Sequence, residues 1–279
     1  MSGAIGFAHN PTIPASAGLL ERGSAWCQEH EVATWQAAAE ETEVIRRQLP
    51  GSRVVCVLGG DGTFLRTALA LDGSEVPALG INLGRVGFLA KVEGGDLERA
   101  LDQVLAGDFG IEERLRLEVT LRRTSGEIEL HPVLNEMVMA RGGRVRMIQV
   151  EVEVSGSHLA TYVADGVVVA TPTGSTAYSF SAGGSILDPR LRNMIITPVA
   201  AYLSPLHSVV AGEDHVVRLT VRDAPYGALV SLDGQQDIPI TTGDVVEVRA
   251  LDVPLRILEP TGSTPFYDLL RTKAALLPY

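Results

Sequence analysis

Apolar residues in roughly the first 110 positions form short β-branched runs, each followed by a segment with helical spacing. The strands are expected at residues 4–8, 32–35, 54–58 and 76–82, and the helices at 19–27, 38–49, 63–71 and 97–105. The run at 54–58 has no polar alternation, which predicts a strand buried on both faces, as in a parallel sheet joined by crossover helices. We therefore expect an α/β domain over residues 1–110.

The pattern changes after Gly110. Segments such as "RLRLEVTLRR", "MIQVEVEV" and "LATYVADGVVVA" alternate or run apolar between Ser-Gly, Asp-Gly and Thr-Gly turns, which is typical of β-sheet. We expect a β-rich domain over 111–255, followed by a tail at 256–279 whose "STPFYDLLRTKAALL" predicts a terminal helix that packs back on the N-terminal domain.

Composition excludes several classes of protein. A net charge of −11 with scattered basic residues disfavours nucleic-acid binding, which needs clustered Lys and Arg. Cys27 and Cys56 form no CxxC pair, so neither a disulfide framework nor a thiolate metal site is expected. The N-terminus lacks the pattern of a signal peptide, and no apolar stretch is long enough for a membrane span, which predicts a cytoplasmic protein without a membrane partner.

The sequence "VLGGDGT" joins the buried strand at 54–58 to the next predicted helix. Gly59, Gly60 and Gly62 can let a phosphate approach backbone N–H groups at a helix start, because glycine has no Cβ in the way. The lysine of a P-loop and the GxGxxG spacing of a dinucleotide fingerprint are both missing.

Asp61 is unexpected in this turn, because phosphates repel a carboxylate. It could bind a Mg²⁺ ion that bridges phosphates, or accept a proton from an attacking hydroxyl. Alternatively, it caps a helix that begins near Thr63.

A second cluster lies in "DGVVVATPTGSTAYSFSAGGSIL", residues 165–187. Its hydroxyls, among them that of Thr173, suit ribose and phosphate oxygens, and the ring of Tyr178 can stack on a base unless it belongs to the core. Upstream, the neighbouring amide of Asn135 and carboxylate of Glu136 can bind the two hydroxyls of a ribose through hydrogen bonds. Strand alternation, however, would point one of the two side chains away from the site.

The order and spacing of GGDGT, "GINLGRVGFLA", "LNEMV" and "DGVVVATPTGSTAYSFSAGGSIL" resemble the NAD kinase family over about residues 54–235. The resemblance implies an α/β, Rossmann-like N-terminal domain and an all-β, β-sandwich-like C-terminal domain, with NAD bound in the cleft between them. It implies phosphoryl transfer from ATP or polyphosphate to the 2′-hydroxyl of the adenosine ribose of NAD, giving NADP. It also implies Mg²⁺ with the donor, and a homodimer or homotetramer.

Residue roles follow from the same resemblance. Asp61 matches the general base for the hydroxyl, with Gly59, Gly60, Gly62 and Thr63 near the phosphates. Phe88 matches a contact on the adenine side.

In the second half of the chain, Asn135 and Glu136 match the pair that holds the ribose. The segment packed against the dinucleotide is matched by Thr176, Ala177 and Tyr178. Asp165 matches an aspartate associated with the nicotinamide carboxamide, with help from Ser181.

The chain departs from the family pattern at three places. Gly212-Glu213 stands where relatives often have Arg-Pro, Val163 stands where many have a basic residue, and Arg85 replaces a common histidine. The first two changes leave acceptor preference and subunit contacts open. Arg85 could supply a cation near phosphate, or it could be an ordinary exposed arginine. Two alternatives to NAD kinase activity are a diacylglycerol-type lipid kinase, which GGDGT alone would allow, and a dinucleotide-binding sensor that has lost catalysis.

Overall fold

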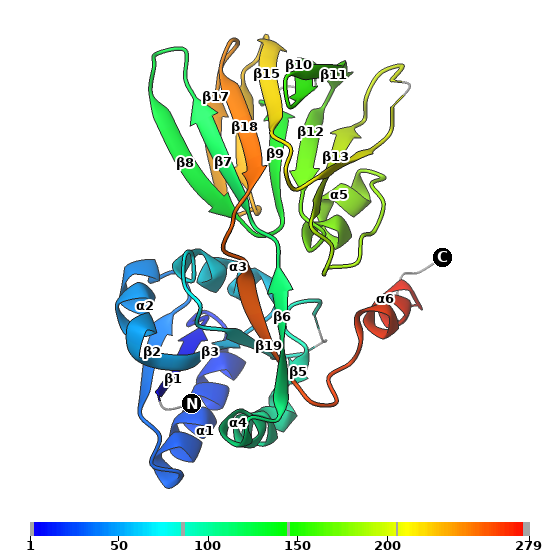
Figure 1. The fold of residues 1–279 in the computed structure, drawn as a ribbon. Coiled ribbons are helices and arrows are strands. Elements are labelled where there is room, and N and C mark those ends of the chain that lie inside the picture. Colours follow the sequence, from blue (N-terminus) through cyan, green and yellow to red (C-terminus); the bar gives the residue numbers. More distant parts are fainter. Residues whose placement is uncertain (1–2, 85–86, 144–145, 205, 276–279) are drawn as a thin grey trace. The chain divides into compact units, whose positions relative to one another are not determined.

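Parallel strands and crossover helices make up the first part of the computed structural model, which describes residues 3–84, 87–143, 146–204 and 206–275 (Figure 1). The chain divides into two units. The first, here called the α/β unit, comprises the described residues of Met1–Glu113 and Leu255–Tyr279. The second, called the β unit, comprises those of Arg114–Pro254.

The α/β unit is built on a sheet with the strand order β2-β1-β3-β4-β19-β6, and β5 pairs with β4. Strands β1, β2, β3 and β4 pair in parallel, as do β4 with β19 and β4 with β5. The strands are β1 (Ala4–His9), β2 (Thr34–Ala38), β3 (Ser52–Leu58), β4 (Ala78–Asn82), β5 (Val92–Glu93), β6 (Phe109–Arg114) and β19 (Leu255–Pro260).

Helices cover both faces of this sheet. They are α1 (Pro14–Glu29), α2 (Thr42–Gln48), α3 (Asp61–Ala70) and α4 (Leu97–Ala106), with short 3-10 helices at Leu49–Gly51 and Gly94–Asp96. A further helix, α6 (Phe266–Ala275), follows β19. Val54, Cys56 and Leu58 of β3 share a core with α1 and α4. Val55 and Val57 alternate with them, are fully buried, and face the side on which α2 and α3 pack. The prediction of a strand buried on both faces is therefore confirmed.

The second strand and second helix lie later than predicted. Strand β2 extends to Ala38 because Trp35 pairs with Gly6 and Ala38 with His9 of β1. Gly6 leaves room for the Trp35 ring, since a Cβ there would lie 2.1 Å from the ring. Pairing with β1 thus takes Ala38 into the sheet, and α2 begins at Thr42 rather than at residue 38.

Two antiparallel sheets form the β unit. The first has the order β11-β10-β15-β18-β7-β8, and the second β14-β13-β12-β9-β16-β17. The first consists of β7 (Leu117–Arg122), β8 (Ile128–Val133), β10 (Ile148–Val154), β11 (Ser157–Ala164), β15 (Val217–Asp223) and β18 (Val245–Ala250). The second consists of β9 (Glu136–Arg141), β12 (Gly166–Ala170), β13 (Asn193–Val199), β14 (Val209–Gly212), β16 (Ala228–Leu232) and β17 (Gln236–Ile240).

The main core of the β unit lies between the two sheets. Alternate residues such as Met137 and Met139 of β9 point into it, together with apolar residues of β7, β10, β12, β15 and β18. The opposite face of the second sheet carries a smaller core that includes Val138 and Val168, and Leu187 of the segment 171–192 packs against it. This segment contains a 3-10 helix at Gly174–Thr176 and α5 (Tyr178–Ser181).

The stretch "LATYVADGVVVA" is divided between the two sheets. Strand β11 ends at Ala164 in the first sheet, and β12 begins at Gly166 in the second, with Asp165 as the only residue between them. A Cβ at Gly166 would lie 2.5 Å from the carbonyl oxygen of Met139, so this crossing passes close to β9.

Among the helices that the structure describes, none is both long enough and apolar enough to cross a membrane.

Candidate functional site

The glycine-rich turn connects the carboxyl end of β3 to the start of α3. Gly59 donates its N–H to Ile81 of β4 at 2.9 Å, and Gly60 is the N-cap residue of α3. A Cβ at Gly59 would lie 2.4 Å from Oγ1 of Thr63, which explains the glycine there, while Gly60 and Gly62 face open space. The turn therefore presents backbone without side chains at a helix N-terminus, where anions bind favourably.

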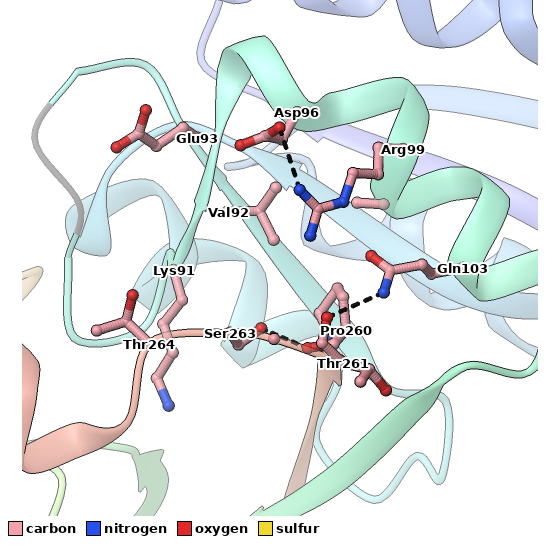
Figure 2. A pocket seen from close by; sticks show the side chains of 12 residues that line it. Lys91, Val92, Glu93, Asp96, Arg99, Gln103, Pro260, Thr261, Ser263 and Thr264 are labelled. Atoms are coloured by element: carbon pink, nitrogen blue, oxygen red, sulfur yellow. Dashed lines mark hydrogen bonds and ion pairs between the residues drawn. The ribbon is translucent and has the colours of Figure 1, made fainter.

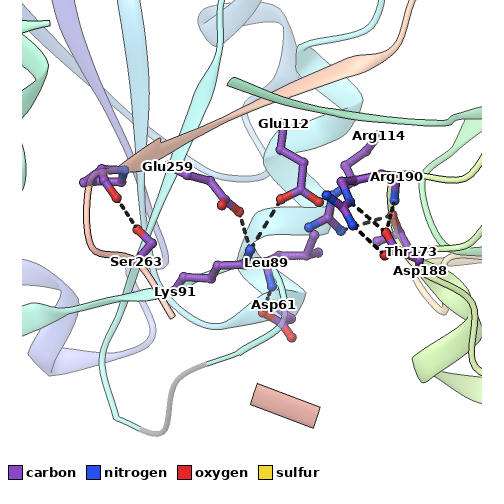
Figure 3. A network of polar contacts seen from close by, with 11 residues as sticks. Asp61, Leu89, Lys91, Glu112, Arg114, Thr173, Asp188, Arg190, Glu259 and Ser263 are labelled. Carbon is purple, nitrogen blue, oxygen red and sulfur yellow. Dashed lines mark hydrogen bonds and ion pairs between the residues drawn. The ribbon is translucent and has the colours of Figure 1, made fainter. Parts of the chain in front are cut away.

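Asp61 is the first residue of α3, and its carboxylate binds a loop that is distant in sequence. Oδ2 accepts the N–H of Phe88 at 3.0 Å, and Oδ1 accepts that of Ala90 at 3.2 Å. Oδ1 also accepts the N–H of Leu89 at 3.1 Å (Figure 3). A Cβ at Gly87 would lie 2.0 Å from Oδ1, so glycine is needed for this approach. The helix has no side-chain cap, so the alternative that Asp61 caps a helix near Thr63 is wrong.

Phe88 belongs to the same loop and contacts the C-terminal helix. Its half-buried ring lies 5.8 Å from that of Phe266 in α6, and Nζ of Lys273 lies 5.0 Å from its centroid. Within the α/β unit, Asp61 and Phe88 are thus brought together by the loop at 87–90. The predicted cation Arg85 lies outside the described residues.

The Asn135–Glu136 pair lies at the start of β9. Asn135 is half-buried and precedes the strand, whereas Glu136 is its first residue and only 6% exposed. Both side chains keep a buried oxygen, Oδ1 of Asn135 and Oε2 of Glu136, without a hydrogen-bond partner among the described residues. Such atoms are rare in folded proteins, and they are therefore suited to bind a polar ligand.

Glu136 also lies close to a second buried carboxylate, that of Asp233. Burial, and secondarily the charge of Asp233, raise the pKa of Glu136 to about 8. At neutral pH the carboxyl is therefore largely protonated and can donate one hydrogen bond as well as accept others.

The segment 171–181 uses most of its hydroxyls to hold its own backbone. Thr171 donates to the carbonyl of Leu134 at 2.6 Å, Ser175 to that of Pro172 at 2.6 Å, and Thr176 to that of Thr173 at 3.2 Å. The expectation that such hydroxyls face ribose and phosphate is therefore wrong for the fully buried Thr171 and Ser175.

Tyr178 and Ser181 of this segment are exposed, whereas Thr173 is buried. Tyr178 is 46% exposed, so the alternative that it belongs to the core is wrong. Ser181 at the end of α5 is exposed, and Ala177 is half-buried and donates its N–H to Gly174 at 2.9 Å. The hydroxyl of Thr173 accepts a hydrogen bond at 3.3 Å from Nη1 of Arg114, whose side chain is almost fully buried (Figure 3).

Gly174 brings this segment against the Asn135–Glu136 pair. A Cβ at Gly174 would lie 2.2 Å from the carbonyl oxygen of Asn135, so only glycine permits the approach. Asp165 lies at the other end of β12 and binds Arg141, whose Nε donates to Oδ1 at 2.8 Å. Within the β unit, Thr173, Thr176 and Ala177 therefore lie on a segment that packs against Asn135, and Asp165 lies a strand length away.

A pocket of about 190 Å³ in the α/β unit contains none of the predicted site residues (Figure 2). Two interactions lie within its lining: Gln103 donates to the carbonyl of Thr261 at 3.0 Å, and Arg99 lies 3.8 Å from Asp96. Lys91, which also lines the pocket, pairs with Glu112 and Glu259 outside it. No group of three or more His, Cys, Asp or Glu residues in the described part of the chain could hold a metal ion.

Sequence reasoning missed two residues at these sites. Asp233 belongs to an Asp-Gly turn, and the turn pattern does not predict that its carboxylate contacts the Asn135–Glu136 backbone. Arg114 begins the alternating strand pattern "RLRLEVTLRR". The sequence signal for Arg114 is a charged residue in a strand pattern whose neighbouring apolar positions are predicted to be buried, since a buried charge needs a partner.

Comparison with known proteins gives consistent matches over both units. Residues 15–109 match the family model of the ATP-NAD kinase N-terminal domain, and residues 134–260 match that of the ATP-NAD kinase C-terminal domain. The NAD kinase of Heliobacterium modesticaldum is 38% identical over 276 residues, which cover 96% of this chain and 97% of that protein. That of Symbiobacterium thermophilum is 42% identical over 220 residues, covering 79% and 77%.

Solved structures resemble the fold as well. Yeast NADH kinase complexed with NADH matches with a TM-score of 0.84 at 21% identity, over 99% of this chain and 87% of that one. An NAD kinase from Archaeoglobus fulgidus in complex with ATP matches with a TM-score of 0.78 at 23% identity, over 100% of both chains. The predicted fold class, an α/β domain combined with an all-β domain of antiparallel sheets, is confirmed.

Proposed function

We propose that this chain, which belongs to the ATP-NAD kinase family, transfers a phosphoryl group from ATP to NAD and so produces NADP. The proposal rests on the family models, which match residues in both units. The lipid-kinase and sensor alternatives find no support in these matches. ATP is supported as donor over polyphosphate by the family description and by the ATP complex of the archaeal relative.

We assign the 2′-hydroxyl of the adenosine ribose as the nucleophile. Its oxygen attacks the terminal phosphorus of ATP, the bond from that phosphorus to the oxygen of ADP breaks, and the hydroxyl proton passes to a base. Such a transfer depends mainly on positioning and on neutralising charge. Mg²⁺ would come bound to ATP as part of the substrate, and it would neutralise charge on the phosphates.

Asp61 is the proposed base. A carboxylate offers about four lone-pair sites, and the loop at 87–90 uses three of them. Because Oδ1 accepts two of these bonds and Oδ2 one, we assign Oδ2 as the atom that accepts the hydroxyl proton. The N–H bonds fix the direction of this oxygen, and a general base has to be positioned in this way.

The phosphates are assigned to the turn formed by Gly59, Gly60, Gly62 and Thr63. Gly60 and Gly62 have open space where a Cβ would lie, and the turn begins a ten-residue helix. Both features support close approach of an anion to backbone N–H groups.

The dinucleotide is assigned to the remaining predicted residues. Asn135 and Glu136 hold the ribose diol, a role supported by their two unpaired buried oxygens. The exposed ring of Tyr178 stacks on a base, with Phe88 on the adenine side and Thr173, Thr176 and Ala177 along the dinucleotide. We further propose that Asp165 and Ser181 contact the nicotinamide carboxamide. The cytoplasmic location and a homodimeric or homotetrameric state also remain predictions.

The activity can be tested with purified protein, Mg²⁺ and the four combinations of NAD or NADH with ATP or polyphosphate, with phosphorylated product measured by chromatography. NADP from NAD and ATP is the expected result. If no combination gives product while calorimetry shows that NAD binds, the chain is a dinucleotide-binding protein without this activity, and the proposal is wrong.

A further inference from the structure

Asp233 occupies a tight turn between β16 and β17. Its φ is 50° and that of Gly234 is 61°, and Gln235 donates its N–H to the carbonyl of Leu232 at 2.8 Å. Two successive residues with positive φ are typical of the type I′ turn of a β-hairpin, in which Asp-Gly is a preferred pair. Turn chemistry therefore explains the conformation of Asp233, but not where its side chain points.

The carboxylate of Asp233 binds three consecutive backbone N–H groups almost one hundred residues earlier in the chain. Oδ2 accepts the N–H of Leu134 at 2.8 Å, and Oδ1 accepts those of Asn135 and Glu136 at 2.8 and 2.9 Å. In return, Asp233 donates its own N–H to the carbonyl of Glu136 at 3.0 Å. Its side chain is 7% exposed, so these bonds are made away from solvent.

The same three residues are held from a second direction by Thr171. Its hydroxyl donates to the carbonyl of Leu134 at 2.6 Å, and its N–H donates to the carbonyl of Asn135 at 2.8 Å. Together, Asp233 and Thr171 bind all six backbone N–H and C=O groups of Leu134, Asn135 and Glu136.

In contrast to this backbone, the side chains of Asn135 and Glu136 each keep an oxygen without a hydrogen-bond partner among the described residues. These atoms, Oδ1 of Asn135 and Oε2 of Glu136, are buried. A buried polar atom without a partner costs free energy, so a fully bonded backbone that carries such atoms is a preorganised binding element.

We propose that Asp233 is a positioning residue that holds the Asn135–Glu136 backbone in its dinucleotide-binding conformation before the ligand arrives. The proposal deepens the proposed function and rests on it for the identity of the ligand. An asparagine cannot replace this carboxylate, because its NH₂ group would face the N–H of Leu134 or of Asn135 and Glu136.

Asp244 provides a matched control in the same unit. It is 2% exposed and accepts the N–H of Thr124 at 2.8 Å and the N–H and hydroxyl of Thr241 at 2.9 and 3.2 Å. Thr124 precedes β8 and Leu134 follows it, so the six residues of that strand, about 20 Å, separate the two sites. Asp244→Asn therefore disrupts a comparable set of hydrogen bonds away from Asn135.

The experiment compares wild type, Asp233→Asn and Asp244→Asn. Asp233→Asn should speed amide hydrogen exchange at residues 134–136 and raise the KM for NAD by about 10- to 100-fold, the scale expected when binding groups are misplaced. The KM for ATP should change by no more than about twofold, since a selective rise in one KM reports lost binding of that substrate. Asp244→Asn should speed exchange at Thr124 and Thr241 while leaving the KM for NAD within about twofold.

Each failure has its own signature. If wild type makes NADP and both variants have the same KM for NAD, the positioning role is wrong while the proposed function stands. If wild type makes no NADP, the proposed function fails, and unchanged exchange at 134–136 in Asp233→Asn would separately overturn the positioning role.

Should Asp233→Asn not fold, Thr171→Val provides the second test. At nearly constant side-chain size, it removes the hydrogen bond to the carbonyl of Leu134, together with one from the N–H of Gly174. We expect a several-fold rise in the KM for NAD, and an unchanged KM would overturn the proposal.

Discussion

Lys91 and Glu259 form an ion pair in the α/β unit in which the lysine side chain is only 6% exposed (Figure 3). The same ammonium lies 3.4 Å from a carboxylate oxygen of Glu112, so one buried cation serves two carboxylates. Burial and the neighbouring Glu112 raise the pKa of Glu259. The three residues come from the loop before β5, from β6 and from β19, and they join segments that are far apart in sequence.

Replacing Lys91 with Met should lower the free energy of unfolding by about 3 kcal/mol, because two half-buried carboxylates would lose the buried cation that they share. Urea denaturation followed by circular dichroism measures this change. Arg22→Met is the control, since Arg22 and Glu98 are 43% and 40% exposed and such surface pairs contribute about 1 kcal/mol or less. Equal effects of the two variants would contradict the prediction.

Asp61→Asn should lower kcat by about 100- to 10,000-fold, the range for loss of a general base, while NAD still binds. Single-turnover kinetics and calorimetry with NAD separate the two quantities. Asp96→Asn is a suitable control, because Asp96 is exposed and immediately precedes α4, which has ten residues like α3. Normal turnover in Asp61→Asn would remove Asp61 from the mechanism and leave it as the residue that holds the loop at 87–90.

Tyr178→Ala should raise the KM for NAD about 2- to 10-fold, corresponding to the loss of one aromatic contact. Because the ring is 46% exposed, the free energy of unfolding should change by no more than about 0.5 kcal/mol. Phe180, 47% exposed in the same short helix, provides the matched Phe180→Ala control and should leave the KM unchanged. A large loss of stability in Tyr178→Ala would return this ring to a structural role.

Stability should depend on pH through Glu136, whose pKa is raised from 4.5 to about 8 by burial and by Asp233. The folded state keeps its proton between these values, whereas the unfolded state releases it, so the contribution is complete below about pH 4.5 and is lost as pH rises through 8.

Urea denaturation at several pH values, compared with Glu136→Gln, isolates this effect. Relative to the variant, wild type should lose up to about 1.4 kcal/mol of unfolding free energy per pH unit across that interval. Parallel pH profiles for the two proteins would show that Glu136 ionises normally in the folded state.

The fold class could be predicted because it depends on local patterns. The non-alternating run at 54–58 and the helical spacing after it required a parallel sheet with crossover helices, while alternation after Gly110 required antiparallel strands. Boundaries were less certain, as α2 shows, because pairing with β1 determined where β2 ended. The sequence pattern does not predict the division of "LATYVADGVVVA" at Asp165. Both halves have the pattern of an apolar strand, and they differ only in the sheet to which each belongs.

By itself, the sequence determined which residues were available for chemistry: a carboxylate in a glycine turn, an amide–carboxylate pair and a segment rich in hydroxyls. Only the tertiary structure decided what those groups bind. Asp61 lies 27 positions from Phe88, and Asp233 lies 98 from Asn135, so no local rule links their carboxylates to those N–H groups. Hydrogen bonds over such separations exist only after strands have paired and loops have closed, and they, rather than the residue types, determine which oxygen atoms remain open to a ligand.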